Sequence, residues 1–142
     1  MKMYSQFTAA VAGTGFIGPV HIEALQRLGV KVKGVLGSSA KKGAKVRDRH
    51  GLEQAFASYD EILKDPDIDS VHLAVPNVLH FEMSKKALLA GKHVMCEKPL
   101  AMNAAETEEL VVLAEETGLA AGVCYNIRYY PLNLEARQRV RN

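Results

Sequence analysis

The sequence predicts an α/β fold in a single domain: a doubly wound parallel sheet with helices on both faces and the strand order 3-2-1-4-5-6. Short apolar segments alternate with helical segments along the chain, as in a parallel sheet with right-handed crossovers. The first apolar segment leads into Gly13-x-Gly15-x-x-Gly18 and then a helix, which fixes the strand order expected for this fold. A length of 142 residues suits one core that buries about 68% of the unfolded chain's surface.

The segment from Phe7 to Leu28 begins this fold and is the expected nucleotide cradle. Residues 7–12 are apolar, as in a buried strand, and a helical pattern then continues until Gly29. At the junction the first glycine suits a tight turn, the second a close approach of the backbone to a pyrophosphate, and the third close packing. A purely structural turn is the alternative, but the flanking strand and helix are the context of a Rossmann dinucleotide site. We predict cofactor contacts from Gly13, Thr14, Gly15, Phe16, Ile17 and Gly18.

The second predicted strand, residues 30–36, is followed by a loop that bears on the choice of cofactor. An acidic residue in this place binds the ribose of NAD, whereas hydroxyl and basic groups accommodate the 2′-phosphate of NADP. Here the loop has no carboxylate, and its cofactor candidates are Ser38, Ser39 and Lys41, with Lys42 beside them. The sequence therefore predicts that NADP is preferred and NAD is possible, although a solvated helix start would have the same composition.

The remaining elements follow in order. A helix is expected over 40–50, a strand over 54–58 and a helical turn over 60–64, before Asp65-Pro66-Asp67 interrupts the chain. Strands are then expected over 70–75, 93–96 and 119–125, and helices over 78–90, 104–117 and 131–141. Asn103 and Glu106 have the spacing of a capping box at the start of the long helix.

Composition excludes several classes of function. A formal charge of +2 gives no basic field strong enough to predict a nucleic acid or a membrane surface as partner. The chain has no run of about 18 apolar residues, and its start lacks the apolar core of a signal peptide, so we expect a cytoplasmic protein. Cys96 and Cys124 lie in apolar runs, which favours buried free thiols and predicts no metal site.

Polar groups gather at the carboxyl ends of the predicted strands, which meet at one edge of a parallel sheet. They include Pro76-Asn77 with His80, Glu97-Lys98-Pro99, and Asn126 with Arg128. With AGTGFIG, VPNVLH at 75–80 and GKHVMCEKPLA at 91–101, these residues make the sequence resemble one family over essentially its whole length. It is the N-terminal domain of the glucose-fructose oxidoreductase, inositol dehydrogenase and MocA (Gfo/Idh/MocA) family, a group of NAD(P)-dependent sugar and cyclitol dehydrogenases.

The resemblance implies roles for individual residues. Lys98 corresponds to a lysine near the nicotinamide and the reacting hydroxyl, where an ammonium stabilises the alkoxide character that develops during hydride transfer; a lone surface charge is the alternative. Glu97 corresponds to a cofactor-contacting glutamate, and it can also pair with Lys98. Pro99 is expected to shape the turn, a cis peptide being one way.

Other positions have both a functional and a structural interpretation. Pro76, Asn77 and His80 are expected near the nicotinamide half of the cofactor, although Asn77 is equally suited to cap the next helix. Asn126 is expected to reach the site, whereas Arg128 is more often an ion-pair partner, and a helical histidine such as His21 can simply pack.

The resemblance also implies a second domain, because family members continue into one that supplies the substrate pocket, an acid/base pair and the oligomer interface. We expect residues 1–128 to form the NAD(P)-binding domain and residues 129–142 to begin the helix that leads to the second domain. The expected activity is hydride transfer between NAD(P) and a secondary alcohol or ketone of a sugar, cyclitol or related polyol, by a homo-oligomer. Because this chemistry needs a closed site on both sides of the nicotinamide, the chain alone should have little activity. The alternative is a free-standing NAD(P)-binding regulatory or redox-sensing module.

Overall fold

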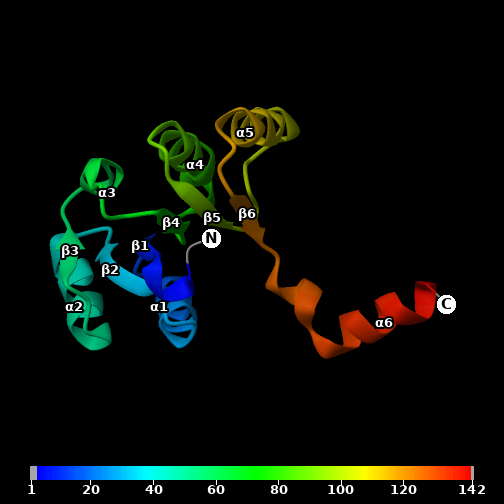
Figure 1. Cartoon of the computed structure of the whole chain (residues 1–142), viewed down its shortest axis with the longest axis horizontal. Helices are drawn as coiled ribbons and strands as arrows, with labels where there is room; N and C mark the ends of the chain where they lie inside the picture. Colours follow the sequence, from blue (N-terminus) through cyan, green and yellow to red (C-terminus); the bar gives the residue numbers. More distant parts are fainter. Residues whose placement is uncertain (1–2, 142) are drawn as a thin grey trace.

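A computed structural model describes residues 3–141, and it contains one six-stranded parallel sheet with the order β3-β2-β1-β4-β5-β6 (Figure 1). The predicted fold class and strand order are therefore confirmed. The strands are β1 (Thr8–Ala12), β2 (Lys31–Leu36), β3 (Gln54–Phe56), β4 (Ser70–Leu73), β5 (His93–Glu97) and β6 (Ala121–Cys124). The helices are α1 (Ile17–Arg27), α2 (Ala40–His50), α3 (Tyr59–Lys64), α4 (His80–Leu89), α5 (Ala104–Thr117) and α6 (Pro131–Arg141). Three short 3₁₀ helices are η1 (Tyr4–Gln6), η2 (Asn77–Leu79) and η3 (Asn126–Tyr129).

The sheet is buried between two layers of helices. On one face Ala9 and Val11 of β1 pack with Ile22 of α1, and on the other Ala10 of β1 belongs to the cluster that contains Leu88 of α4. Figure 1 shows α1 and α2 on one side of the sheet and α3, α4 and α5 on the other. Since burying one such aliphatic side chain contributes about 1.5–3 kcal/mol, these two clusters fix the position of β1 in the middle of the sheet.

Side-chain caps set the starts of three of the six described α-helices. Ser39, Ser58 and Asn103 accept hydrogen bonds from the backbone amides of Lys42, Glu61 and Glu106, at the starts of α2, α3 and α5. Glu106 accepts a bond from the amide of Met102 in return, close to the predicted capping box. Strand β3 ends at Phe56 rather than at the predicted residue 58, because Ser58 is already the cap of α3.

The last helix, α6, lies apart from the sheet (Figure 1). None of its described residues is buried, its main contact is with η3, and its Leu132 and Val140 are 82% and 88% exposed. Among residues 3–141, no helix combines the length and the apolar character needed to cross a membrane.

Candidate functional site

A cleft of about 730 Å³ lies at the carboxyl edge of the sheet, where β1, β2, β4 and β5 end. Of the residues predicted from the sequence, it is lined by Gly13, Thr14, Gly15, Phe16, Ile17, Ser38, Pro76, Asn77, His80, Glu97 and Lys98. The cleft is also lined by Lys42, which the sequence placed beside the loop candidates, and by Tyr59 and Met83, which the sequence did not single out. Gly18, Ser39, Lys41 and Asn126 are not among the lining residues. The structure thus brings most, but not all, of the predicted set together.

The three glycines of the loop have different surroundings. Gly13 has a φ of 121°, and a Cβ there would lie 2.1 Å from the carbonyl oxygen of Ala74. A Cβ on Gly18 would lie 2.1 Å from the carbonyl oxygen of Gly13, so Gly18 allows helix α1 to pack against the loop. Gly15 is exposed, and a Cβ there would have no neighbour within 4 Å. The first and third glycines therefore serve the fold, whereas the second leaves room on the cleft side.

The N-terminus of α1 is open toward the cleft. Its N-cap residue, Phe16, makes no side-chain capping hydrogen bond, in contrast to the serine and asparagine caps of α2, α3 and α5. The first amides of a helix need partners from outside the helix, and together with the helix dipole they favour an anion. Thr14, Gly15 and Ile17 line the cleft beside these amides, so the arrangement suits a pyrophosphate.

The loop after β2 contributes a hydroxyl and an ammonium group. Lys42 Nζ donates a hydrogen bond of 3.1 Å to Ser38 Oγ, and both residues line the cleft. Ser39 has a structural role, since its side chain caps α2. Lys42 rather than Lys41 lies on the cleft because the helical turn directs one of the two neighbouring lysines away.

Asn77 and His80 lie where β4 leads into α4. Asn77 is the first residue of η2, and within the described chain its side chain makes no capping hydrogen bond, so its amide lies on the cleft without that structural role. His80 is fully buried, with Nδ1 2.6 Å from the carbonyl oxygen of Pro99 and Nε2 2.9 Å from that of Val75. Its imidazole thereby connects the ends of β4 and β5. The Lys98–Pro99 peptide bond is cis.

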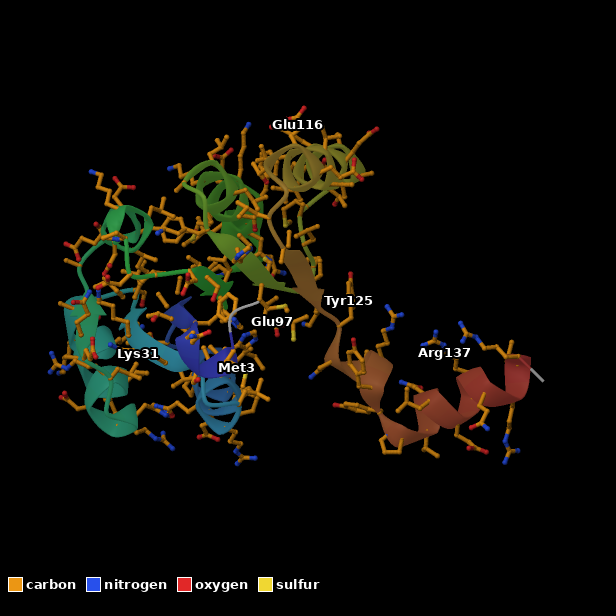
Figure 2. All side chains as sticks on the ribbon, viewed as in Figure 1. Met3, Lys31, Glu97, Glu116, Tyr125 and Arg137 are labelled. Carbon is orange, nitrogen blue, oxygen red and sulfur yellow. The ribbon has the colours of Figure 1, made fainter. Side chains whose placement is uncertain are left out.

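The turn after β5 presents Lys98 to the cleft. Among the described residues, the Lys98 ammonium has no ion-pair partner, and Glu97 instead accepts a hydrogen bond of 3.2 Å from the Lys98 backbone amide. Burial raises the pKa of Glu97, but hydrogen bonds from His21, the Cys124 thiol and the Lys98 amide outweigh it and hold that pKa below its usual value. Glu97 is therefore an ionised carboxylate, labelled at the end of β5 in Figure 2.

Sequence reasoning missed the partners of Glu97. His21 lies on α1, is 8% exposed, and places Nε2 3.1 Å from a Glu97 carboxylate oxygen. Its helical spacing from the buried Gly18 and Ile22 was a usable signal for a buried polar side chain. The ligand-type atoms of His21, Glu97 and Cys124 lie within 4.8 Å of one another, but the hydrogen bonds just described account for this grouping without a metal.

A second hollow, of about 350 Å³, lies between α4, α5 and β6, away from the glycine loop. It is lined mainly by aliphatic side chains, including Leu88, Leu110 and Val123. Its described lining residues include no lysine or arginine that would bind a phosphate, and Glu115 among them would repel one, so the cleft at the carboxyl edge is the candidate for a dinucleotide.

Comparison with known proteins identifies the family of this chain. Residues 7–125 match the model of the Gfo/Idh/MocA oxidoreductase family, described as having an NAD-binding Rossmann fold. A 1,5-anhydro-D-fructose reductase from Ensifer adhaerens is 38% identical over 107 residues, which are 75% of this chain and 32% of that protein. GenD2 from gentamicin A biosynthesis, solved with NAD, superposes with a TM-score of 0.91 at 28% identity, over 98% of this chain and 40% of that one.

A further solved relative carries the other dinucleotide. Biliverdin reductase from Synechocystis sp. PCC 6803, in complex with biliverdin and NADP⁺, superposes with a TM-score of 0.84 at 29% identity, over 95% of this chain and 43% of that one. The chain thus spans about a third to two fifths of the length of these relatives. The fold, the glycine loop in its cleft and the matched segment agree, and the chain belongs to the Gfo/Idh/MocA family of oxidoreductases and contains its NAD(P)-binding Rossmann domain.

Proposed function

We propose that this chain is the cofactor-binding half of an oxidoreductase that transfers hydride between NAD(P) and a secondary alcohol or ketone of a sugar, cyclitol or related polyol. One observation carries the proposal. A single cleft has an anion-binding end, formed by Gly15 and the uncapped start of α1, and an exposed ammonium, Lys98, on the turn after β5. The first group suits the pyrophosphate and the second suits an oxygen that becomes negative.

Residues of this chain would then have separate tasks. The bound nicotinamide supplies or accepts the hydride. The glycine loop and the amides of α1 would hold the pyrophosphate, and Asn77 would contact the nicotinamide half from the end of β4. Lys98 would orient the substrate oxygen and stabilise its partial negative charge, because an ammonium interacts more strongly with an alkoxide than with a neutral hydroxyl.

The choice of cofactor rests on the loop after β2. In the cleft, Ser38 Oγ and Lys42 Nζ are 3.1 Å apart and can both donate hydrogen bonds to a 2′-phosphate. The residues that line this part of the cleft include no carboxylate that would repel a phosphate. This supports NADP as the preferred cofactor, with NAD as the less favoured one, and relatives are known with each.

The relatives bear on the substrate class. The name of the 1,5-anhydro-D-fructose reductase from Ensifer adhaerens supports a polyol or sugar, whereas the biliverdin reductase binds biliverdin. The part of the chain described here supplies only one side of the site, from the glycine loop to Lys98. A sugar or cyclitol is therefore the proposed class, to be identified in the whole protein.

We also propose that residues 1–128 form the cofactor domain and that residues 129–142 lead to a second domain that closes the substrate site and forms the homo-oligomer contact. None of the described residues of α6 is buried, and its Leu132 and Val140 lie in solvent. These exposed apolar side chains support the proposal that another part of a longer protein covers α6. The relatives are two to three times as long as this chain. The chain alone should then bind cofactor with little turnover.

A cofactor titration tests the proposal. Isothermal calorimetry of the purified chain should detect binding of NADPH and weaker binding of NADH. The free-standing regulatory alternative makes the same prediction for binding, but it gives Lys98 no task, so kinetics of Lys98 variants in the whole protein separate the two. Absence of binding by both dinucleotides would refute both functions.

A further inference from the structure

Four polar side chains from four elements meet beneath the turn that carries Lys98. They are His21 of α1, His72 of β4, Glu97 of β5 and Cys124 of β6. His21 Nδ1 lies 2.9 Å from His72 Nδ1, and His21 Nε2 lies 3.1 Å from Glu97 Oε1. Because the group joins segments up to 103 positions apart in the sequence, from residue 21 to residue 124, it exists only in the folded sheet.

The chemistry of the groups sets the direction of one of these hydrogen bonds. An ionised carboxylate can only accept, so the hydrogen between His21 and Glu97 belongs to His21 Nε2. The Nδ1 atoms of His21 and His72 share a single hydrogen, so one ring donates and the other accepts. Burial and the neighbouring His21 lower the pKa of His72 to about 4, so His72 is neutral near pH 7.

The network reaches Lys98 through the backbone. Glu97 accepts bonds from His21 at Oε1 and from the Lys98 amide at Oε2, and the Cys124 thiol is a further partner. The Glu97 side chain is 14% exposed, so water replaces these partners poorly. His21 is 8% exposed and is not among the residues that line the cleft.

We propose that His21 is a positioning residue: it holds the Glu97 carboxylate, and Glu97 holds the turn that places Lys98 in the cleft. This inference rests on the proposed function, since only a catalytic Lys98 makes the position of the turn important for turnover. The same helix, α1, has the uncapped N-terminus that is proposed to bind the pyrophosphate. The structure thus connects the cofactor-binding helix to the proposed catalytic lysine by two side chains.

The link can be tested in the purified chain by ¹⁵N–¹H and ¹³C NMR, without cofactor. His21→Phe keeps an aromatic ring but removes both hydrogen bonds, whereas His21→Gln keeps a donor and an acceptor in one amide. His93→Phe is the matched control, because it removes a histidine hydrogen bond, to the amide of Ala120, at the opposite end of the same strand. If His21→Phe does not fold, His72→Phe serves instead, since it removes the hydrogen-bond partner of His21 Nδ1.

We expect His21→Phe to move the amide resonance of Lys98 and to raise the pKa of Glu97, because a hydrogen bond that favours the ionised carboxylate is lost. His21→Gln and His93→Phe should leave both close to wild type. A Lys98 amide and a Glu97 pKa that stay unchanged in folded His21→Phe would overturn the proposal. Resonance changes spread over the whole sheet of His21→Phe, with no excess at Glu97 and Lys98, would indicate a general loss of structure and would also overturn the proposal.

In the whole protein, His21→Phe should lower kcat by up to about a hundredfold while the Kd for NADPH stays the same, because a small displacement of a catalytic group is costly. His21→Gln should recover most of kcat. Unchanged kcat in His21→Phe, with NADPH still bound, would overturn the positioning role alone. A chain that binds neither dinucleotide would overturn the proposed function and with it the catalytic meaning of the link, whatever the NMR result.

Discussion

Replacing Gly15 should separate cofactor binding from folding. A Cβ at this position has no neighbour within 4 Å, and the residue does not have the positive φ that disfavours side chains, so Gly15→Val should change the free energy of unfolding by no more than about 0.5 kcal/mol. The two added methyl groups would occupy the side of the loop that the pyrophosphate must approach. We expect the affinity for NADPH to fall by more than about tenfold, or ~1.4 kcal/mol.

Gly13→Ala is the comparison, because it should lower the free energy of unfolding, which Gly15→Val should leave nearly unchanged. Its φ of 121° costs an alanine about 1–3 kcal/mol, and relief of a 2.1 Å contact with the Ala74 carbonyl oxygen costs a similar amount. The sum, about 2–6 kcal/mol, is a large part of the stability of a small domain. Urea denaturation followed by circular dichroism measures the unfolding free energies, and calorimetry measures NADPH binding. Wild-type affinity in Gly15→Val would refute the assignment of the loop.

Three further predictions concern other parts of the site. In the whole protein, Lys98→Ala should lower turnover by about a hundredfold to a thousandfold with little change in NADPH affinity. Lys98→Arg should not fully restore turnover. Near-normal steady-state kinetics of Lys98→Ala would remove the catalytic assignment. Ser38→Asp should invert the cofactor preference in calorimetry, because a carboxylate repels the 2′-phosphate of NADP and accepts hydrogen bonds from the ribose hydroxyls of NAD. A retained preference for NADPH would show that this loop does not select the cofactor. His72 has a pKa of about 4 in the folded protein, compared with 6.5 for an ordinary histidine. Between these pH values His72 binds a proton only in the unfolded state, so the folded state loses stability as the pH falls from 6.5 to 4. The loss from this group is at most about 3 kcal/mol, and His72→Gln should show a flatter pH dependence in urea titrations than wild type; identical slopes would contradict the depressed pKa.

Much of the cleft could be predicted because a parallel sheet gathers its strand ends at one edge. Once the glycine loop identified the first strand, the strand order followed, and with it the meeting of Ser38, Asn77 and Lys98. No contact between these residues had to be known in advance. The alternation of strands and helices was sufficient, since each strand end is marked by a change from apolar to polar residues.

The choice between neighbouring residues could not be predicted in the same way. Ser39 and Lys41 look as suitable for a phosphate as Ser38 and Lys42, but the cap of α2 uses one serine and the helical turn places one lysine on the cleft. These details depend on side-chain direction at a helix start. The composition of the loop gives its charge, but it does not show which side-chain atoms face the ligand.

The polar network beneath Lys98 could not be predicted because its partners are distant in the sequence. His21 and Glu97 are 76 positions apart, and their contact depends on how closely α1 packs against the sheet. That packing is set by Gly18, where a Cβ would lie 2.1 Å from the Gly13 carbonyl oxygen. The glycine pattern was visible in the sequence, but its consequence for a buried histidine became visible only in three dimensions.

The proposed function requires that the cleft at the carboxyl edge of the sheet binds a nicotinamide dinucleotide. The most direct measurement is a titration of the ¹⁵N-labelled chain with NADPH, followed by the shifts of its backbone amides. We predict saturable shifts concentrated in residues 13–18, at Ser38 and at Lys98, all of which are close to or line the cleft. Saturable shifts that leave the glycine loop unaffected and fall instead on α4, α5 and β6, around the apolar hollow, would contradict it.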